Sequence, residues 1–241
     1  MVRFFDIFFS GLALALLSPL LIPVMIILKF TGEGEVFYLQ ERVGKDGKPF
    51  KLMKFATMLK DSPNMKMGTV TVKDDPRVLP FGKFLRKTKI NELPQLINIL
   101  KGDMSIIGPR PQTNRCFLAF PKKSQEAIKQ LKPGLSGIGS VVFRDEEEIL
   151  DDPDIDRLKF YDEVIAPYKG ELEEWYVKHQ SLYTYFMLIF LTAWAVIKPD
   201  TKLHFKVFKD LPKPPKELEG KLWLINQYLE NTTLEVSTTK I

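Results

Sequence analysis

Two long apolar stretches dominate the pattern of hydrophobic and polar positions along the chain. The first, Ile7 to Leu28, runs 22 residues without a charge. A straight helix of that length reaches about 33 Å, which is enough to cross a bilayer. The second, Ser181 to Ile197, has 17 uncharged residues. That length is short for a span, and it favours either a core helix or an interfacial helix with aromatic residues at headgroup depth.

The first stretch allows several arrangements. The acid Asp6 and the lack of a small-residue cleavage pattern argue against a cleaved signal peptide. Ser18 and Pro19 lie in the middle and predict a sharp bend, because proline removes a backbone donor and clashes with the preceding turn. Basic residues on both sides favour cytoplasmic ends and a re-entrant helix. A straight span and a buried soluble helix stay open as alternatives.

Shorter patterns follow the first stretch. Apolar-rich runs flank "GKDGK", and Asp46-Gly47 is a turn signal, so Gly34 to Met58 predicts a β-hairpin. Lys51 and Lys54 fall in or after its second strand, where a solvated face is the simplest interpretation. "FGKFLRKTK" predicts a short basic helix that carries Arg86.

The segment "INELPQLINILKGDMSIIGPRP" carries the densest chemistry. On a helical wheel, one face holds four apolar residues, and Asn91, Gln95 and Asn98 fall opposite. Pro94 places the helix start near Asn91, which is a natural N-cap, with Glu92 in the first turn. A helix start with free amides also suits a phosphate. The prolines around Arg110 favour a fixed guanidinium that can grip one.

Composition narrows the classes of function. The net charge of +5 favours anionic partners such as phosphates or a membrane surface. One cysteine and two histidines exclude an intrachain disulfide and a Cys/His metal site built from this chain alone. The chain has no P-loop and no GxGxxG motif. Its lysines are spread along the sequence beside a membrane stretch, which argues against nucleic acid as a partner.

Several motifs in a fixed order resemble one family, the monotopic bacterial phosphoglycosyl transferases with a bacterial sugar transferase domain. The resemblance covers roughly Arg3 to Lys209. It rests on "RFFD" with the apolar run, "QERVGKDGKPFKLMKFATM", the "INELPQL" segment and "KPGLSGIGSVVFR". It implies a mainly helical α+β fold, monotopic in the membrane. A re-entrant helix-break-helix would form residues 1–30, and the catalytic domain, residues 31–209, would lie on the membrane with an interfacial helix near 181–197.

The resemblance also implies a reaction. Such enzymes transfer a sugar phosphate from a UDP-sugar to undecaprenyl phosphate and release UMP, with Mg²⁺, at the cytoplasmic face of the bacterial inner membrane. This is the first membrane step of polysaccharide synthesis. A homodimer or a downstream glycosyltransferase is a further candidate partner. The implied catalytic residues are Asn91 and Glu92, with Glu92 also the metal ligand. The implied substrate-binding residues are Lys54, Arg86, Arg110 and Arg144.

The sequence departs from the family pattern at Asn91, where the family carries an Asp nucleophile. An amide is a poor nucleophile and cannot form the acyl phosphate that a carboxylate forms. Four explanations stay open: Glu92 as nucleophile, direct transfer to the lipid phosphate, an engineered variant, or a non-catalytic relative that binds sugar nucleotide or a partner enzyme. Residues 210–241 lie outside the resemblance and predict a linker and a short amphipathic helix.

Overall fold

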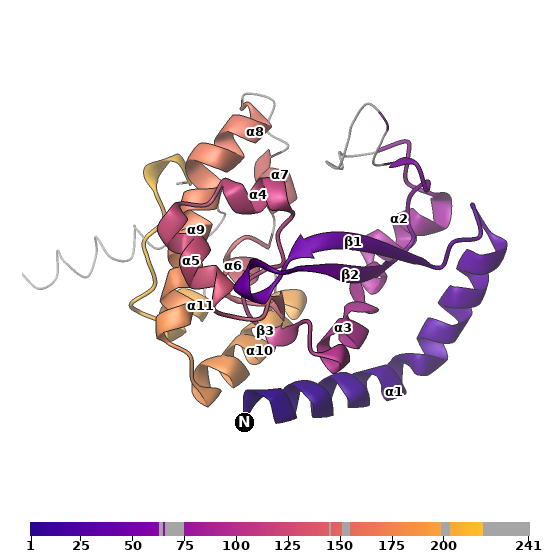
Figure 1. Ribbon diagram of the computed structural model, residues 1–241, viewed down its shortest axis with the longest axis horizontal. Coiled ribbons are helices and arrows are strands. Elements are labelled where there is room, and N and C mark those ends of the chain that lie inside the picture. Colours follow the sequence, from indigo (N-terminus) through magenta and orange to yellow (C-terminus); the bar gives the residue numbers. More distant parts are fainter. Residues whose placement is uncertain (63–64, 66–74, 145, 151–154, 199–202, 219–241) are drawn as a thin grey trace, which may run out of the picture. The chain divides into compact units, whose positions relative to one another are not determined.

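The computed structural model describes residues 1–62, 65, 75–144, 146–150, 155–198 and 203–218 (Figure 1). Helices and two small sheets make up this part of the chain, which confirms the mainly helical α+β class. The chain divides into two units. The first unit is Met1–Gly44 with Lys48–Ile106, and the second is Lys45–Gly47 with Ile107–Ile241.

The first unit contains a long helix, a hairpin and two short helices around a 3₁₀ turn. In chain order these are α1 (Val2–Phe30), β1 (Phe37–Val43), β2 (Pro49–Phe55), α2 (Pro80–Lys87), η3 (Ile90–Glu92) and α3 (Gln95–Lys101). Strands β1 and β2 pair antiparallel, as predicted. Asp46 and Gly47 take φ angles of 57° and 72° at the turn. These left-handed conformations are the ones that an Asp-Gly hairpin turn requires.

Helix α1 continues through the two residues at which the sequence predicts a break. The Ser18 hydroxyl donates a hydrogen bond of 2.8 Å to the carbonyl of Ala15. That carbonyl is the acceptor that the Pro19 nitrogen, which carries no hydrogen, leaves unserved four residues later. The serine therefore compensates for the proline, and the helix bends along its length without being interrupted (Figure 1).

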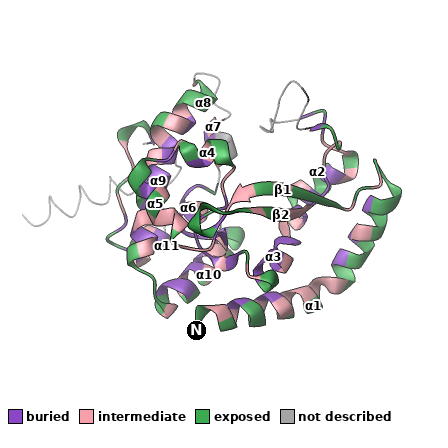
Figure 2. Ribbon diagram, in the orientation of Figure 1, coloured by how far each residue is buried: buried purple, intermediate pink, exposed green. Residues whose placement is uncertain are grey.

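One face of α1 packs on its own unit and the other is exposed and apolar (Figure 2). Leu21, Val24 and Leu28 join Phe55 and Leu85 in a hydrophobic cluster. The exposed face includes the large side chains of Phe4, Ile7, Phe8, Leu12, Leu16, Leu20, Ile22 and Ile26. Among the described residues, Val2–Phe30 is the one helix that is long and apolar enough to cross a membrane. Such an exposed stripe is typical of a surface that meets lipid.

Polar contacts fix the start of α1 to the same unit. The Arg3 guanidinium donates to the carbonyl of Leu100, at 2.8 Å, and to that of Ile99. The buried Asp6 carboxylate accepts from the Ser105 hydroxyl at 3.0 Å and from the Ile106 backbone N–H at 2.9 Å. The "RFFD" motif thus joins the first turns of α1 to the end of α3 and the residues after it.

The start of α3 differs from the prediction. Pro94 occupies the N-cap position, and Asn91 lies three residues earlier in η3, where its side chain caps nothing. The reason is that Ile90–Glu92 closes a separate 3₁₀ turn before the proline. The polar face of the wheel is buried, with Gln95 and Asn98 inside, whereas Leu100 is exposed. At the other end, Gly102 has φ 96° and forms the predicted C-cap.

The second unit is mainly helical. Its elements are η1 (Lys45–Gly47), α4 (Asn114–Leu118), α5 (Lys122–Lys129), β4 (Gly134–Ser136), α6 (Ile138–Val142), α7 (Glu146–Leu150), α8 (Arg157–Phe160), η4 (Tyr161–Ile165), α9 (Ala166–Lys178), α10 (Leu182–Ile197), α11 (Leu203–Val207) and η5 (Lys216–Leu218). Strand β4 pairs with β3 (Ser105–Ile107). A side chain at Gly134 would place its Cβ 2.1 Å from the backbone nitrogen of Gly108, so this approach requires glycine.

Helix α10 combines both interpretations of the second apolar stretch. One face is buried in the unit and includes Tyr185, Leu188 and Leu191. Tyr183, Phe186 and Phe190 lie exposed on the other side, as an interfacial helix would present them. Membrane contact by this helix stays a prediction. The predicted tail helix falls on residues 219–241, outside the described residues.

Candidate active site

The first unit brings Lys54 and Glu92 together. Lys54 lies on β2 and Glu92 ends η3, and their side chains form an ion pair of 3.3 Å. The two side chains are 19% and 26% exposed. Because of this partial exposure, solvent screens the attraction between the two charges less than at the surface, yet water still reaches both groups. A phosphate or a cation from solution therefore has access to both charges. The solvated strand face favoured for the two lysines holds only for Lys51, which is exposed and pairs with Glu41.

Asn91 lies directly before Glu92 and is buried. Its side-chain oxygen, Oδ1, has no hydrogen-bond partner among the described residues. A buried carbonyl oxygen without a donor is costly, by about 1 to 3 kcal/mol. Such an atom marks either strain or a position where a bound group supplies the missing contact.

The backbone before this turn is strained. Lys89 has φ 58°, a left-handed backbone conformation that residues other than glycine rarely adopt. Its carbonyl accepts the backbone N–H of Glu92 at 3.1 Å, which closes the turn. Strain of this kind costs about 1 kcal/mol or more and gathers at functional sites. Here it lies two residues from Asn91.

Arg86 comes from α2, which packs against η3. Its guanidinium donates to the thioether sulfur of Met58 at 3.6 Å, a weak acceptor. Within the described part of the chain, no carboxylate pairs with Arg86. Arg86 thus keeps its hydrogen-bonding capacity for another anion.

Arg110 and Arg144 belong to the second unit. Both are exposed. The backbone N–H of Arg110 donates to the carboxylate of Glu173, and burial raises the pKa of that carboxyl to about 7. The Arg144 guanidinium donates to the carbonyl of Ala195 near the end of α10. Both arginines thus belong to a different unit from Lys54 and Glu92.

A magnesium ion fits the residues at this site. Mg²⁺ takes oxygen ligands and is commonly held by one or two carboxylates together with substrate phosphates and water. Glu92 offers a carboxylate, and Asn91 offers an amide oxygen that lacks a donor. The described residues contain no group of three or more His, Cys, Asp or Glu that could enclose a metal. An ion bound here would take most of its ligands from outside the protein.

Sequence analysis missed two residues that support the pair. Asn98 of α3 bonds to the backbone of β2, and Asp103 bonds to Asn98. The wheel places Asn98 on the polar face, and that was the only signal available. Helical spacing gives no indication that this face packs against a strand.

The first unit thus combines a partly exposed cation–carboxylate pair, a buried amide oxygen and an exposed apolar helix, which is compatible with a monotopic membrane protein. The chain belongs to the bacterial sugar transferase family, which matches residues 1–199.

Three relatives illustrate the family. The chain is 50% identical over 127 residues to a Bacillus subtilis (strain 168) protein provisionally named an undecaprenyl-phosphate N-acetylgalactosaminyl 1-phosphate transferase, covering 52% of this chain and 68% of that one. It is 41% identical over 138 residues to the UDP-glucose:undecaprenyl-phosphate glucose-1-phosphate transferase of Escherichia coli (strain K12), covering 55% of this chain and 29% of the relative. It is 32% identical over 212 residues to the undecaprenyl-phosphate galactose phosphotransferase of Salmonella typhimurium (strain LT2), covering 82% and 40%. The chain thus spans less than half the length of the last two.

Proposed function

We propose that the chain transfers a sugar phosphate from a UDP-sugar to undecaprenyl phosphate and releases UMP, as the first membrane step in the synthesis of a bacterial polysaccharide. The observation that carries the proposal is the Lys54–Glu92 pair beside Asn91, where the resemblance to the family implies the catalytic residues. The names of the relatives supply the substrate class.

Each candidate residue of the site in the first unit has a role in this proposal. Lys54 and Arg86 neutralise the diphosphate of the donor, since phosphoryl transfer depends mainly on positioning and charge. Glu92 and the amide oxygen of Asn91 would hold Mg²⁺, which would supply positive charge to neutralise the phosphate oxygens. Arg110 and Arg144, which are exposed on the second unit, stay predicted substrate-binding residues.

Asn91 favours direct transfer. A carboxamide does not attack phosphorus, and Glu92 is already engaged by Lys54 and assigned to the metal. An oxygen of the lipid phosphate would instead form a bond to the sugar-bearing phosphorus of the donor. The bond from that phosphorus to the bridging oxygen breaks, and UMP leaves with that oxygen and its electron pair. No covalent enzyme intermediate is formed.

The first experiment measures UMP release from a panel of UDP-sugars with undecaprenyl phosphate and Mg²⁺. Release with one donor is expected, with sequential kinetics and no phosphosugar adduct by intact mass. An adduct lost in Glu92→Gln would identify Glu92 as the nucleophile and overturn direct transfer. No release by the wild type, and none by Asn91→Asp, would overturn the transferase proposal and favour a non-catalytic relative that binds sugar nucleotide.

The proposal includes a re-entrant α1 at the cytoplasmic face of the inner membrane. A helix of 29 residues is about 43 Å long and exceeds the hydrocarbon core of a bilayer. Polar contacts attach Arg3 and Asp6, at its start, to the first unit. Just after its end, Glu33 bonds to Lys60 of the same unit. Two ends bound to one folded unit favour entry and exit by one face. A tag at residue 1 that is protected from a cytoplasm-side protease would contradict this topology.

A further inference from the structure

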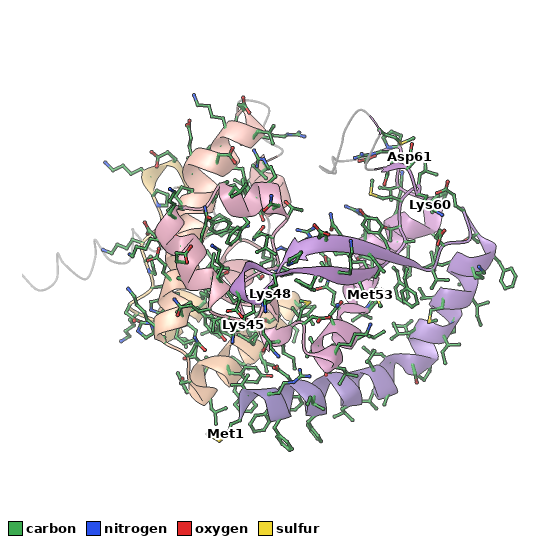
Figure 3. All side chains as sticks on the ribbon, in the orientation of Figure 1. Met1, Lys45, Lys48, Met53, Lys60 and Asp61 are labelled. Atoms are coloured by element: carbon green, nitrogen blue, oxygen red, sulfur yellow. The ribbon has the colours of Figure 1, made fainter. Side chains whose placement is uncertain are left out.

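Asn98 occupies an unusual place for a polar side chain. It lies on α3 and is 2% exposed, against the free edge of strand β2. Its Oδ1 accepts the backbone N–H of Met53 at 2.9 Å, and its Nδ2 donates to the carbonyl of Lys51 at 2.8 Å. Figure 3 labels Met53 on this strand. The side-chain amide therefore pairs with β2 as the peptide group of a third strand would.

Asp103 fixes the orientation of this amide. The Asn98 Nδ2 also donates to Asp103 Oδ2 at 3.2 Å. In return, the Asn98 backbone carbonyl accepts the N–H groups of Gly102 and Asp103, each at 3.0 Å. An ionised carboxylate only accepts hydrogen bonds, so Nδ2 must face Asp103 and Oδ1 must face Met53. Asn98 and Asp103 thus bond to each other while Asn98 bonds to the edge of β2, and we call this arrangement the clamp.

The clamp joins the two elements that carry the candidate active site. Met53 directly precedes Lys54 on β2, and α3 begins three residues after Glu92. Any shift between β2 and α3 changes the separation of the Lys54 amine and the Glu92 carboxylate, which is 3.3 Å. We propose that Asn98, oriented by Asp103, is a positioning residue that sets the Lys54–Glu92 pair for the diphosphate of the donor. This inference rests on the proposed function.

A double-mutant cycle on UMP release tests the positioning role. Asn98→Ala should lower kcat/KM about tenfold in the wild-type background but less than about twofold when Lys54 is already replaced by Met, because the two changes act on one contact. Ser105→Ala is the matched control. It removes a buried hydrogen bond to Asp6 elsewhere in the unit, and its effect should be the same in both backgrounds. Equal effects of Asn98→Ala in both backgrounds would overturn the proposal.

A second readout does not depend on turnover. Acetylation of Lys54 by an amine-reactive ester, followed by peptide mass spectrometry, should be at least about threefold faster in Asn98→Ala, since a loosened pair exposes the amine. The exposed Lys87 is the internal reference and should react equally in both proteins. Unchanged Lys54 labelling would overturn the positioning role even in an active enzyme. A wild type that releases no UMP but shows the labelling difference would overturn the proposed function alone.

Asp103 variants complete the test where Asn98→Ala does not fold. Asp103→Ala should reproduce the loss in kcat/KM and the faster labelling. Asp103→Asn should restore most of both, because its carbonyl can accept the same hydrogen bond from Asn98. Failure of Asp103→Asn to perform better than Asp103→Ala would contradict the assigned role of this acceptor.

Discussion

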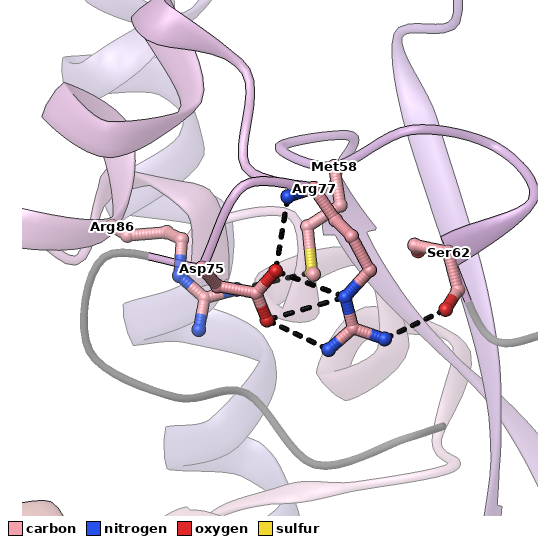
Figure 4. A network of polar contacts seen from close by, with 5 residues as sticks. All are labelled: Met58, Ser62, Asp75, Arg77 and Arg86. Atoms are coloured by element: carbon pink, nitrogen blue, oxygen red, sulfur yellow. Dashed lines mark hydrogen bonds and ion pairs between the residues drawn. The ribbon is translucent and has the colours of Figure 1, made fainter. Parts of the chain in front are cut away.

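Two of the cation–carboxylate pairs in the first unit differ in how completely their polar atoms are hydrogen-bonded. Arg77 and Asp75 are 4% and 0% exposed, and the guanidinium meets both carboxylate oxygens, at 2.9 and 2.7 Å (Figure 4). A third nitrogen of Arg77 donates to the carbonyl of Ser62 at 2.8 Å. Lys54 and Glu92, in contrast, are partly exposed and joined by a contact of 3.3 Å.

The difference separates a pair that stabilises the fold from a pair whose charged groups can change partners when a ligand binds. Separating a buried bidentate pair would leave two uncompensated charges out of contact with water, so its partners stay together. A longer, partly solvated pair loses little when a phosphate replaces the carboxylate or a metal replaces the lysine. Sequence alone offers one acid and one base in each case. The geometry around them decides which pair can take part in chemistry.

The largest expected effect on stability is at Arg77. Arg77→Met should lower the free energy of unfolding by about 3 to 5 kcal/mol, because it leaves Asp75 as an unpaired buried charge. Denaturant unfolding in detergent measures this loss. Lys51→Met is the control, since its pair with Glu41 is exposed, and it should change stability by less than about 1 kcal/mol. Similar small changes in the unfolding free energy of both variants would contradict a stabilising role for the Arg77–Asp75 pair.

Glu173, in the second unit, is a buried carboxyl group that is only partly hydrogen-bonded. It is fully buried, and its Oε2 has no partner among the described residues. Burial raises its pKa from 4.5 to about 7, so the folded state favours the protonated acid. The stability this provides is complete below pH 4.5 and is lost as the pH rises through 7.

Glu173→Gln should therefore remove a pH dependence of up to about 3 kcal/mol between pH 5 and 8. Unfolding free energies of the wild type and the variant, measured across that range, should diverge as the pH rises, with the variant losing less. Parallel curves would show that the carboxyl is not held protonated and would place Glu173 with the fully paired acids.

The smallest expected effect on stability is at Lys89. Its left-handed backbone precedes the turn that carries Glu92. Lys89→Gly should stabilise the protein by about 1 kcal/mol, because glycine adopts that conformation without strain. Lys87→Gly, in the regular helix α2, should destabilise it by up to about 1 kcal/mol. Thermal unfolding in detergent compares the two. A loss of stability in both would indicate that Lys89 is not strained.

Local signals explain what the sequence predicted well. Asp46-Gly47 and Gly102 act through their own backbone conformations, so the hairpin and the end of α3 follow from a few residues. Asn91 was placed wrongly as an N-cap because the separate 3₁₀ turn depends on the strained Lys89 and on packing by α2. The contacts of Asn98 with β2 and of Arg77 with Ser62 depend on tertiary approach. No spacing rule encodes such approaches.

The most direct test of the account compares two lysines on the same strand. Lys54→Met and Lys51→Met each remove one charge from β2, but only Lys54 contacts Glu92. If the pair forms the phosphate site, Lys54→Met should lower kcat/KM for UMP release about 100-fold or more, while Lys51→Met changes it less than about twofold. Both variants should keep the wild-type unfolding temperature within a few degrees. Equal activity of the two variants would contradict the assignment of the active site to Lys54 and Glu92.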